Sequence, residues 1–230
     1  LSDIPGLVGA SAVQNIGAYG VEIGERIEAV NCISLEDGTK RTFCQEECCY
    51  SYRHSIFKTP EYRGRYAVTS VDYCLDKIFT PNIEYAGIRQ VLSSDGVDIT
   101  GLSAIQLRNT IINIRKNKLP DPKVQGNAGS FFMNPIVDSA TFGRLKSMYA
   151  DMPGYVVDDT HMKIPAAWLI EQCGWKGAAL GRAGVHLRQP LVLVNLGGAT
   201  GNDIKLLSDR IQQDVLGKFG VKITPEVNFI

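Results

Sequence analysis

Two prolines separated by a single aspartate, Pro120 and Pro122, lie near the middle of the 230-residue chain. Proline disfavours helical geometry in the residue before it and has no N–H to donate within a helix or a strand. A helix that enters this segment must therefore end there. A chain of this length is long enough for two modest domains. We therefore predict a domain boundary here, with one domain over residues 1–119 and the other over residues 120–230.

The first half of the sequence predicts loops and antiparallel strands. Residues 4–24 are rich in glycine, which favours loops packed against a ligand or another backbone over a regular element. Residues 30–43 predict a β-hairpin around Asp37-Gly38, and residues 66–75 alternate in the manner of a strand. Ser103 and Gln106 predict a capping box for a helix that continues to about Lys116.

The second half predicts mixed helices and strands. Ser139 suits the N-cap of a helix that continues to about Tyr149, and residues 166–173 predict a helix that Gly174 ends. Residues 203–219 carry apolar side chains at helical spacing. Residues 191–194 indicate a short buried strand.

A last strand is predicted over residues 221–230. Its alternation would place the side chains of Glu226 and Asn228 on one face.

Composition limits the classes of partner and site. Lys plus Arg and Asp plus Glu both total 24, so the formal net charge is zero, which argues against a nucleic-acid-binding surface or an anionic membrane as partner. No apolar run has the length of a membrane-spanning helix, and no signal peptide is apparent. The six cysteines and three histidines match no metal-ligand spacing, so we expect reduced cysteines, no metal site and a cytoplasmic protein.

Several motifs leave a structural and a functional interpretation open. The stretch from Gln14 to Gly20 suits either a tight loop or a flat heterocycle bound by amides and bare backbone. The glycine-rich stretch 195–201 has the wrong spacing for a dinucleotide fingerprint, and a plain turn is favoured over a phosphate loop. The basic residues Arg115, Lys116, Lys118 and Lys123 suit a diphosphate or a solvated helix end. Arg53 suits either a carboxylate clamp or a surface ion pair.

The segment GNAGSFFMNP, residues 126–135, places a single serine between a glycine turn and two phenylalanines. We expect Phe131 and Phe132 to anchor this turn in the core, which leaves Ser130 to be explained.

Four motifs in this order, IPGLVGASAVQNIGAYG, YRHSIFK, KLPDPKVQGNAGSFFMNP and PEVNFI, resemble the UDP-N-acetylenolpyruvoylglucosamine reductase (MurB) family over essentially the whole chain. Tyr85 resembles the mobile-loop tyrosine of the type I enzymes. The resemblance implies an α+β fold: the second half of a vanillyl-alcohol-oxidase-type FAD-binding domain, then a mixed α/β domain that binds the UDP-sugar.

The resemblance also implies a reaction and its cofactors. NADPH reduces FAD, and the flavin reduces the enolpyruvyl ether of UDP-N-acetylglucosamine enolpyruvate to UDP-N-acetylmuramate, a step of peptidoglycan precursor synthesis. Ser130 matches the proton donor of the family, and Arg53 and Glu226 match the pair that stabilises the enol intermediate, a role of the oxyanion-hole type. A monomer is expected.

Binding residues are implied in the same way. Positions that match those holding the UDP-sugar are Tyr85, Lys118, Asn134, Tyr155, Lys176 and Gln189. Positions that match those lining FAD are Pro5, Gly6, Val8, Gly9, Gln14, Asn15, Gly17, Ala18, Tyr19 and Arg115.

Two departures from the family stand out. Asn228 occupies a position where the family often has arginine, which would weaken flavin contacts or require compensation elsewhere. The chain begins at Leu1 without the N-terminal lobe of the family and its glycine-rich loop, and it lacks a short C-terminal tail, so we expect a fragment. The alternative function is therefore a truncated, non-catalytic fragment of the same fold that binds a nucleotide sugar.

Overall fold

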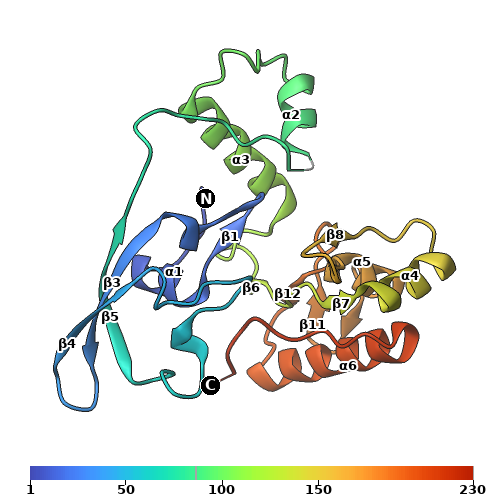
Figure 1. Ribbon diagram of the computed structural model, residues 1–230. Coiled ribbons are helices and arrows are strands. Elements are labelled where there is room, and N and C mark those ends of the chain that lie inside the picture. Colours follow the sequence, from blue (N-terminus) through green and yellow to red (C-terminus); the bar gives the residue numbers. More distant parts are fainter. Residues whose placement is uncertain (86, 230) are drawn as a thin grey trace. The chain divides into compact units, whose positions relative to one another are not determined.

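The computed structural model describes residues 1–85 and 87–229 of the chain. The chain forms two compact units, Leu1–Arg115 and Lys116–Ile230 (Figure 1). Both contain helices and sheets, so the mixed helix and sheet content expected from the sequence is confirmed. No helix in the described ranges is both long and apolar enough to cross a membrane.

The first unit is built on a three-stranded antiparallel sheet in the order β4-β3-β5. The central strand β3 (Ile27–Ser34) pairs with β4 (Lys40–Cys44) and β5 (Tyr66–Tyr73). Gly38, with φ of +74°, lies in the connection between β3 and β4. The predicted hairpin and the predicted strand after it are therefore confirmed.

One face of this sheet is covered by aromatic rings and by α1 (Val8–Gln14). Phe43 is fully buried and packs edge-on against Phe57 and Tyr66. The guanidinium of Arg41 lies 4.1 Å from the centroid of the Phe43 ring, a cation–π contact. These contacts form a core that depends on residues of the first unit alone.

The glycine-rich stretch is more regular than its composition predicts. The loop expected throughout residues 4–24 is wrong in part, because this stretch holds helix α1, the short strands β1 (Gly17–Ala18) and β2 (Val21–Glu22), and the 3₁₀ turn η1 (Ile23–Arg26). Gly9 is the one glycine within α1, where Ala12 is fully buried, so core packing outweighs the cost of that glycine.

A second helical cluster in the first unit is formed by α2 (Ile88–Ser94) and α3 (Ala104–Lys118). The predicted capping box of α3 is confirmed, because the Ser103 hydroxyl accepts from the Gln106 N–H at 3.2 Å and the Gln106 amide oxygen accepts from the Ser103 N–H at 2.9 Å. The helix ends directly before Leu119-Pro120, as the prolines require.

The second unit contains an antiparallel sheet in the order β10-β11-β12-β6. Its strands are β10 (Ala179–Leu180), β11 (Ala183–Val185), β12 (Val192–Asn195) and β6 (Asn127–Ser130). The run predicted at residues 191–194 is thus a buried strand, shifted by one residue. A smaller sheet has the order β7-β9-β8, formed by Ile136–Asp138, His161–Lys163 and Tyr155–Val156.

Three helices of this unit contribute to one core with the larger sheet. They are α4 (Ser139–Met148), α5 (Ala166–Gln172) and α6 (Gly201–Phe219). All three were predicted, but the cap of α4 is Asp138 and not Ser139: its carboxylate accepts from the Thr141 N–H at 2.7 Å. Asp138 satisfies an otherwise unpaired helix N–H, which Ser139, already helical, does not.

The strand predicted over residues 221–230 is wrong where the structure describes it. Residues 221–229 lie outside the named strands, and residue 230 lies outside the described residues. Phe132 and Pro225 form one isolated bridge. Pro225 has no N–H to donate, which weakens a regular ladder at this point. The alternation that would place Glu226 and Asn228 on one face of a strand therefore has no basis.

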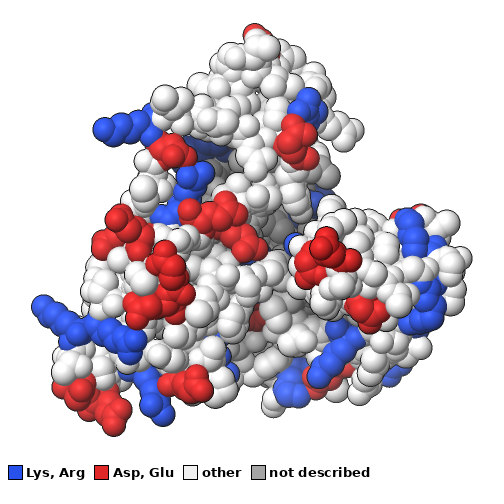
Figure 2. Space-filling model, viewed as in Figure 1, with Lys and Arg blue, Asp and Glu red and all other residues white. Residues whose placement is uncertain are grey.

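Charged groups of both signs are interspersed on each unit. Figure 2 shows lysine and arginine beside aspartate and glutamate over the face in view. This distribution agrees with the zero net charge of the sequence.

Candidate functional site

Arg53 occupies a tight turn with strained backbone geometry. Ser51 and His54 form a bridge through two backbone hydrogen bonds, of 3.2 and 2.9 Å, with Tyr52 and Arg53 at the tip. Arg53 has φ of +54°, in the left-handed region that costs a non-glycine residue about 1–2 kcal/mol. Such a conformation persists only where surrounding contacts hold it, and it is enriched at functional sites.

The guanidinium of Arg53 is directed to the glycine-rich stretch of the same unit. Its Nη2 donates to the Gly17 carbonyl at 2.8 Å. A Cβ placed on Gly17 would lie 3.0 Å from Nη1 of Arg53 and 3.1 Å from the Val21 carbonyl. A side chain at position 17 would therefore require Arg53 or the β1–β2 turn to shift by a few tenths of an ångström, whether or not a ligand approaches.

Asn15, another predicted flavin-lining residue, is 1% exposed and uses its side chain within the unit. Its amide nitrogen donates to the Ser51 carbonyl at 2.8 Å and to the Glu22 carboxylate at 2.7 Å. This links the glycine-rich stretch to the turn that carries Arg53. Asn15 and Arg53 are thus parts of one hydrogen-bonded network.

A second group of predicted binding residues meets at Tyr19. Arg115 lies close to Tyr19 and donates from Nε to the Asp3 carbonyl at 3.2 Å, across 112 residues of sequence. Burial raises the pKa of Tyr19, and the charge of Arg115 opposes that rise. The Tyr19 and Tyr85 rings meet edge to face with centroids 5.6 Å apart. The structure therefore brings together Tyr19, Tyr85 and Arg115, which the sequence places far apart.

Residues 6–8 offer an apolar surface, and Asp3, a few residues before them, accepts the hydrogen bond from Arg115. Leu7 is 83% exposed and Val8 is also exposed. Gly6, with φ of +123°, has no atom within 4 Å of the position of an added Cβ. Uncovered apolar groups, an open glycine and a fixed guanidinium suit a flat heterocycle with an anionic end. The residues present therefore fit a flavin nucleotide.

Ser130 and Glu226 lie on two segments of the second unit that are joined by a backbone hydrogen bond. Ser130 ends β6, and Gly129, directly before it, has φ of +71°. The next residue, Phe131, accepts the Glu226 N–H at 2.8 Å on its carbonyl and donates to the Leu191 carbonyl at 2.7 Å. Phe131 and Phe132 are buried, which confirms them as anchors, whereas Ser130 is exposed and Glu226 half-buried.

The residues of this unit that were predicted to hold the UDP-sugar make separate contacts, each with its own neighbours. Asn134 accepts the Ala166 N–H at 2.9 Å, at the start of α5. Lys176 pairs with Glu171 at 2.7 Å on the surface, and Tyr155 is 45% exposed on β8. Gln189 accepts the Leu191 N–H at 3.4 Å, near the carbonyl that Phe131 contacts. Lys118 is the last residue of α3.

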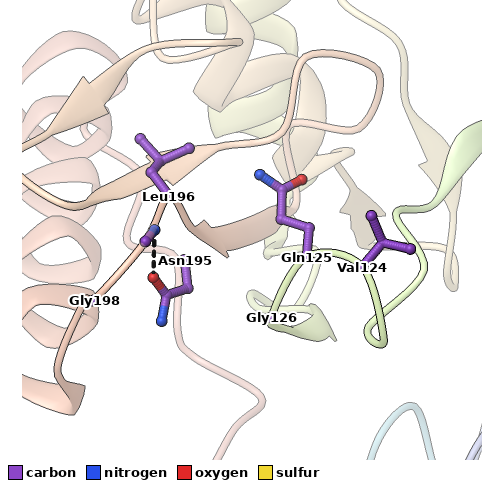
Figure 3. Close-up of a pocket in the computed structure, with 7 residues that line it drawn as sticks. Val124, Gln125, Gly126, Asn195, Leu196 and Gly198 are labelled. Atoms are coloured by element: carbon purple, nitrogen blue, oxygen red, sulfur yellow. Dashed lines mark hydrogen bonds between the residues drawn. The ribbon is translucent and has the colours of Figure 1, made fainter.

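A shallow pocket of about 530 Å³ lies at the other end of β6 from Ser130, lined by residues 124–126 and 195–198 (Figure 3). Gly126 and Ser130 are four residues apart, roughly 13 Å along a strand. Asn195 accepts the N–H groups of Gly197 and Ala199 at 2.8 and 3.0 Å. The favoured interpretation of this stretch as a plain turn is supported, since its backbone donors bind its own side chain.

The start of α6 also favours a plain turn over a phosphate-binding loop. Thr200 and Asp203 form a reciprocal capping box, with the Asp203 carboxylate 2.7 Å from the Thr200 N–H. A carboxylate of the chain itself therefore occupies the place where a phosphate would bind.

Known proteins provide an independent comparison. Residues 121–230 match the family model described as UDP-N-acetylenolpyruvoylglucosamine reductase, C-terminal domain. Proteins named UDP-N-acetylenolpyruvoylglucosamine reductase match over the whole chain: one from Bacteroides fragilis at 52% identity, over 68% of its length, and one from Porphyromonas gingivalis at 48%, over 67%.

A solved structure has a similar fold. The crystal structure of UDP-N-acetylenolpyruvylglucosamine reductase (MurB) from Thermus caldophilus matches with a TM-score of 0.60 at 22% identity, covering 98% of this chain and 61% of that one. The sequence matches extend through both units, including the segments that carry Arg53, Ser130 and Glu226. On this basis the chain belongs to the UDP-N-acetylenolpyruvoylglucosamine reductase family.

Proposed function

We propose that the protein carrying this chain reduces UDP-N-acetylglucosamine enolpyruvate to UDP-N-acetylmuramate in peptidoglycan precursor synthesis, with FAD and NADPH as cofactors. The observation that carries this proposal is the backbone hydrogen bond of 2.8 Å from the Glu226 N–H to the carbonyl of Phe131, the residue directly after Ser130. These adjacent segments carry a hydroxyl, which can protonate an enol-like carbon, and a carboxyl group, which can hydrogen-bond the enol.

Ser130 would donate its hydroxyl proton to the substrate carbon that bears the carboxylate. Serine is a weak acid in water, but an enolate carbon is a strong base, so the transfer can proceed downhill. A neutral donor also avoids repulsion with the substrate carboxylate. The exposed position of Ser130, with its neighbours Phe131 and Phe132 buried, supports a role in contact with a ligand.

Arg53 and Glu226 would together stabilise the enol intermediate, Arg53 through its positive charge and Glu226 through a hydrogen bond to the enol. Preorganised groups of this kind lower a barrier by about 2.7–4 kcal/mol each in comparable cases. The strained backbone of Arg53 supports this role, because the contacts that hold it fix the direction of its guanidinium.

Residues 1–119 would form part of the flavin-binding domain. Pro5, Gly6 and Val8 would offer the apolar surface, and Tyr19 and Arg115 the polar and cationic groups. When bound, FAD supplies hydride transfer between NADPH and an electron-poor alkene. Asn15 and Gly17 would support this site through their contacts to the Arg53 turn.

Residues 120–230 would form the substrate-binding domain. Tyr155, Lys176 and Gln189 would bind the UDP-sugar together with Asn134, and Lys118 and Tyr85 would complete the set. Tyr155 and Lys176 are exposed, which is compatible with such contacts.

The test measures the two half-reactions of the complete, flavin-loaded protein. NADPH is used to reduce the flavin, and the enolpyruvyl sugar is then used to reoxidise it while UDP-N-acetylmuramate is identified by mass spectrometry. Ser130→Ala should leave reduction by NADPH nearly unchanged and slow reoxidation by roughly 10²–10⁴-fold. Ser147→Ala, an exposed serine of the same unit, is the matched control.

Two results would count against the proposal. Equal losses in both half-reactions would remove Ser130 as the proton donor. Binding of the UDP-sugar without any product from the unmodified protein would favour the non-catalytic alternative.

A further inference from the structure

The carbonyl oxygen of Arg53 accepts a hydrogen bond of 2.8 Å from the Nζ of Lys58. The donor comes from the segment that follows the turn, and the contact is partly buried. It fixes the peptide group that Arg53 shares with His54. The side chain of Arg53 is fixed independently, by its contact with the Gly17 carbonyl.

The backbone that carries Lys58 is held by buried side chains and hydrogen bonds. It ends the 3₁₀ turn η2 (Ile56–Lys58), in which Phe57 is buried. Ser55 is fully buried, and its hydroxyl donates to the Val13 carbonyl at 2.6 Å. The Ile56 N–H donates to the Cys48 carbonyl at 2.8 Å. Because these contacts do not depend on the conformation of residues 51–54, the Lys58 ammonium keeps its position if that turn changes.

The orientation of the Arg53 carbonyl is coupled to the left-handed backbone. Rotation of Arg53 to an ordinary conformation would turn this carbonyl and would also change the direction of its Cα–Cβ bond. The guanidinium would then lose its alignment with Gly17. A charged donor on the carbonyl opposes that rotation, and charge-assisted hydrogen bonds are the stronger kind.

We propose that Lys58 is a positioning residue for Arg53, which keeps the arginine in the left-handed conformation that aligns its guanidinium. The kinetic consequence rests on the proposed function, because it assumes that Arg53 stabilises the enol of the substrate. The conformational consequence does not, because it concerns the backbone of residues 51–54 alone.

The first experiment measures the conformation. The backbone ¹³C chemical shifts of residue 53 report its φ and ψ in the complete protein by selective labelling of arginine. Lys58→Met keeps the aliphatic stem and removes the donor, so the shifts should move away from left-handed values. Lys58→Arg restores a cation and should return the shifts of residue 53 to left-handed values. Lys40→Met, an exposed lysine on β4, should leave them unchanged.

The second experiment measures the half-reactions of the same flavin-loaded variants. Lys58→Met should slow reoxidation by the enolpyruvyl sugar roughly 10- to 100-fold, the worth of one hydrogen bond to a charged group. Reduction by NADPH should change less than about twofold, because the arginine acts only on the substrate. In an Arg53→Lys background the additional effect of Lys58→Met should vanish, since both changes remove one interaction.

The outcomes separate this inference from the proposed function. Unchanged shifts at residue 53 in Lys58→Met would overturn the inference whatever the protein catalyses. Equal losses in both half-reactions, or additive losses with Arg53→Lys, would show that Lys58 acts on stability alone. If the shifts change in Lys58→Met but the unmodified protein forms no UDP-N-acetylmuramate, the conformational role of Lys58 stands and the proposed function is overturned.

Discussion

Asn15 accepts a hydrogen bond from the Gly24 backbone N–H at 2.8 Å on its side-chain oxygen. The two residues are nine positions apart, and this contact closes the glycine-rich stretch onto itself. A Cβ added to Gly24 would lie 2.8 Å from that oxygen and 2.8 Å from Cγ of Tyr50. The network that reaches the Arg53 turn therefore depends on the absence of a side chain at position 24.

Gly24→Ala should lower the free energy of unfolding by about 1–3 kcal/mol through overpacking. Gly143→Ala is its control: Gly143 lies within α4, with nothing within 4 Å of an added Cβ. Alanine there should raise stability by about 0.5–1 kcal/mol, because it restricts the unfolded chain and favours the helix. Urea denaturation of the two variants checks both signs. A neutral Gly24→Ala would mean that Asn15 and Tyr50 shift without cost.

Local patterns predicted many of the elements. The turn at Asp37-Gly38, the capping box at Ser103 and a helix over residues 203–219 follow from nearest neighbours in the sequence. The structure contains all three, and the helix begins two residues earlier, at Gly201. Residues 221–229 were predicted as a strand from alternation alone. Alternation does not reveal whether a partner edge is available, and here Phe132 and Pro225 form an isolated bridge.

In the candidate site, too, the sequence identifies residues, whereas their contacts are set by tertiary structure. Motifs identify Arg53, Ser130 and Glu226 by resemblance, but the contacts that hold them depend on tertiary structure. The hydrogen bond from Lys58 to Arg53 spans five residues in an irregular turn, so it leaves no periodic signal. Asn15 was assigned to flavin binding, whereas its side chain is engaged with Glu22, Gly24 and Ser51. Its lack of exposure could not be inferred from sequence.

The core beneath α6 offers a paired test of packing. Leu207 is fully buried, whereas its neighbour Leu206 is 59% exposed. Leu207→Ala should cost about 2–5 kcal/mol of stability, because it leaves a cavity among α5, α6 and the larger sheet. Leu206→Ala should change stability by less than about 0.5 kcal/mol. Comparable losses in the two variants would contradict the orientation of α6.

Arg115 should contribute to flavin affinity through its charge and its fixed geometry. Arg115→Met removes the donor to the Asp3 carbonyl and the partner of Tyr19. We expect the dissociation constant for FAD to rise roughly 10- to 100-fold, as for a hydrogen bond to a charged group. Flavin fluorescence measures this constant. Arg108→Met, an exposed arginine on the same helix, should leave it unchanged. Equal affinities for all three proteins would remove Arg115 from the flavin site.

His186 predicts a pH dependence of stability. Its Nδ1 is buried with no hydrogen-bond partner among the described residues, and burial, followed by the charge of Arg188, lowers its pKa below the usual 6.5. Above pH 6.5 the imidazole is neutral in the folded and unfolded states, so its contribution is constant. As pH falls through 6.5, the unfolded state binds a proton first, and stability decreases until the folded-state pKa is reached.

Replacing the imidazole should remove this part of the pH dependence. His186→Asn should flatten the curve of unfolding free energy between about pH 5 and pH 7, when the curve is compared with that of the unmodified protein. Arg188→Gln should flatten it in part, because it removes only the smaller cause of the shift. Urea denaturation at several pH values measures the curves. Parallel curves for the unmodified protein and His186→Asn would show that His186 titrates alike in both states, contrary to the burial of its Nδ1.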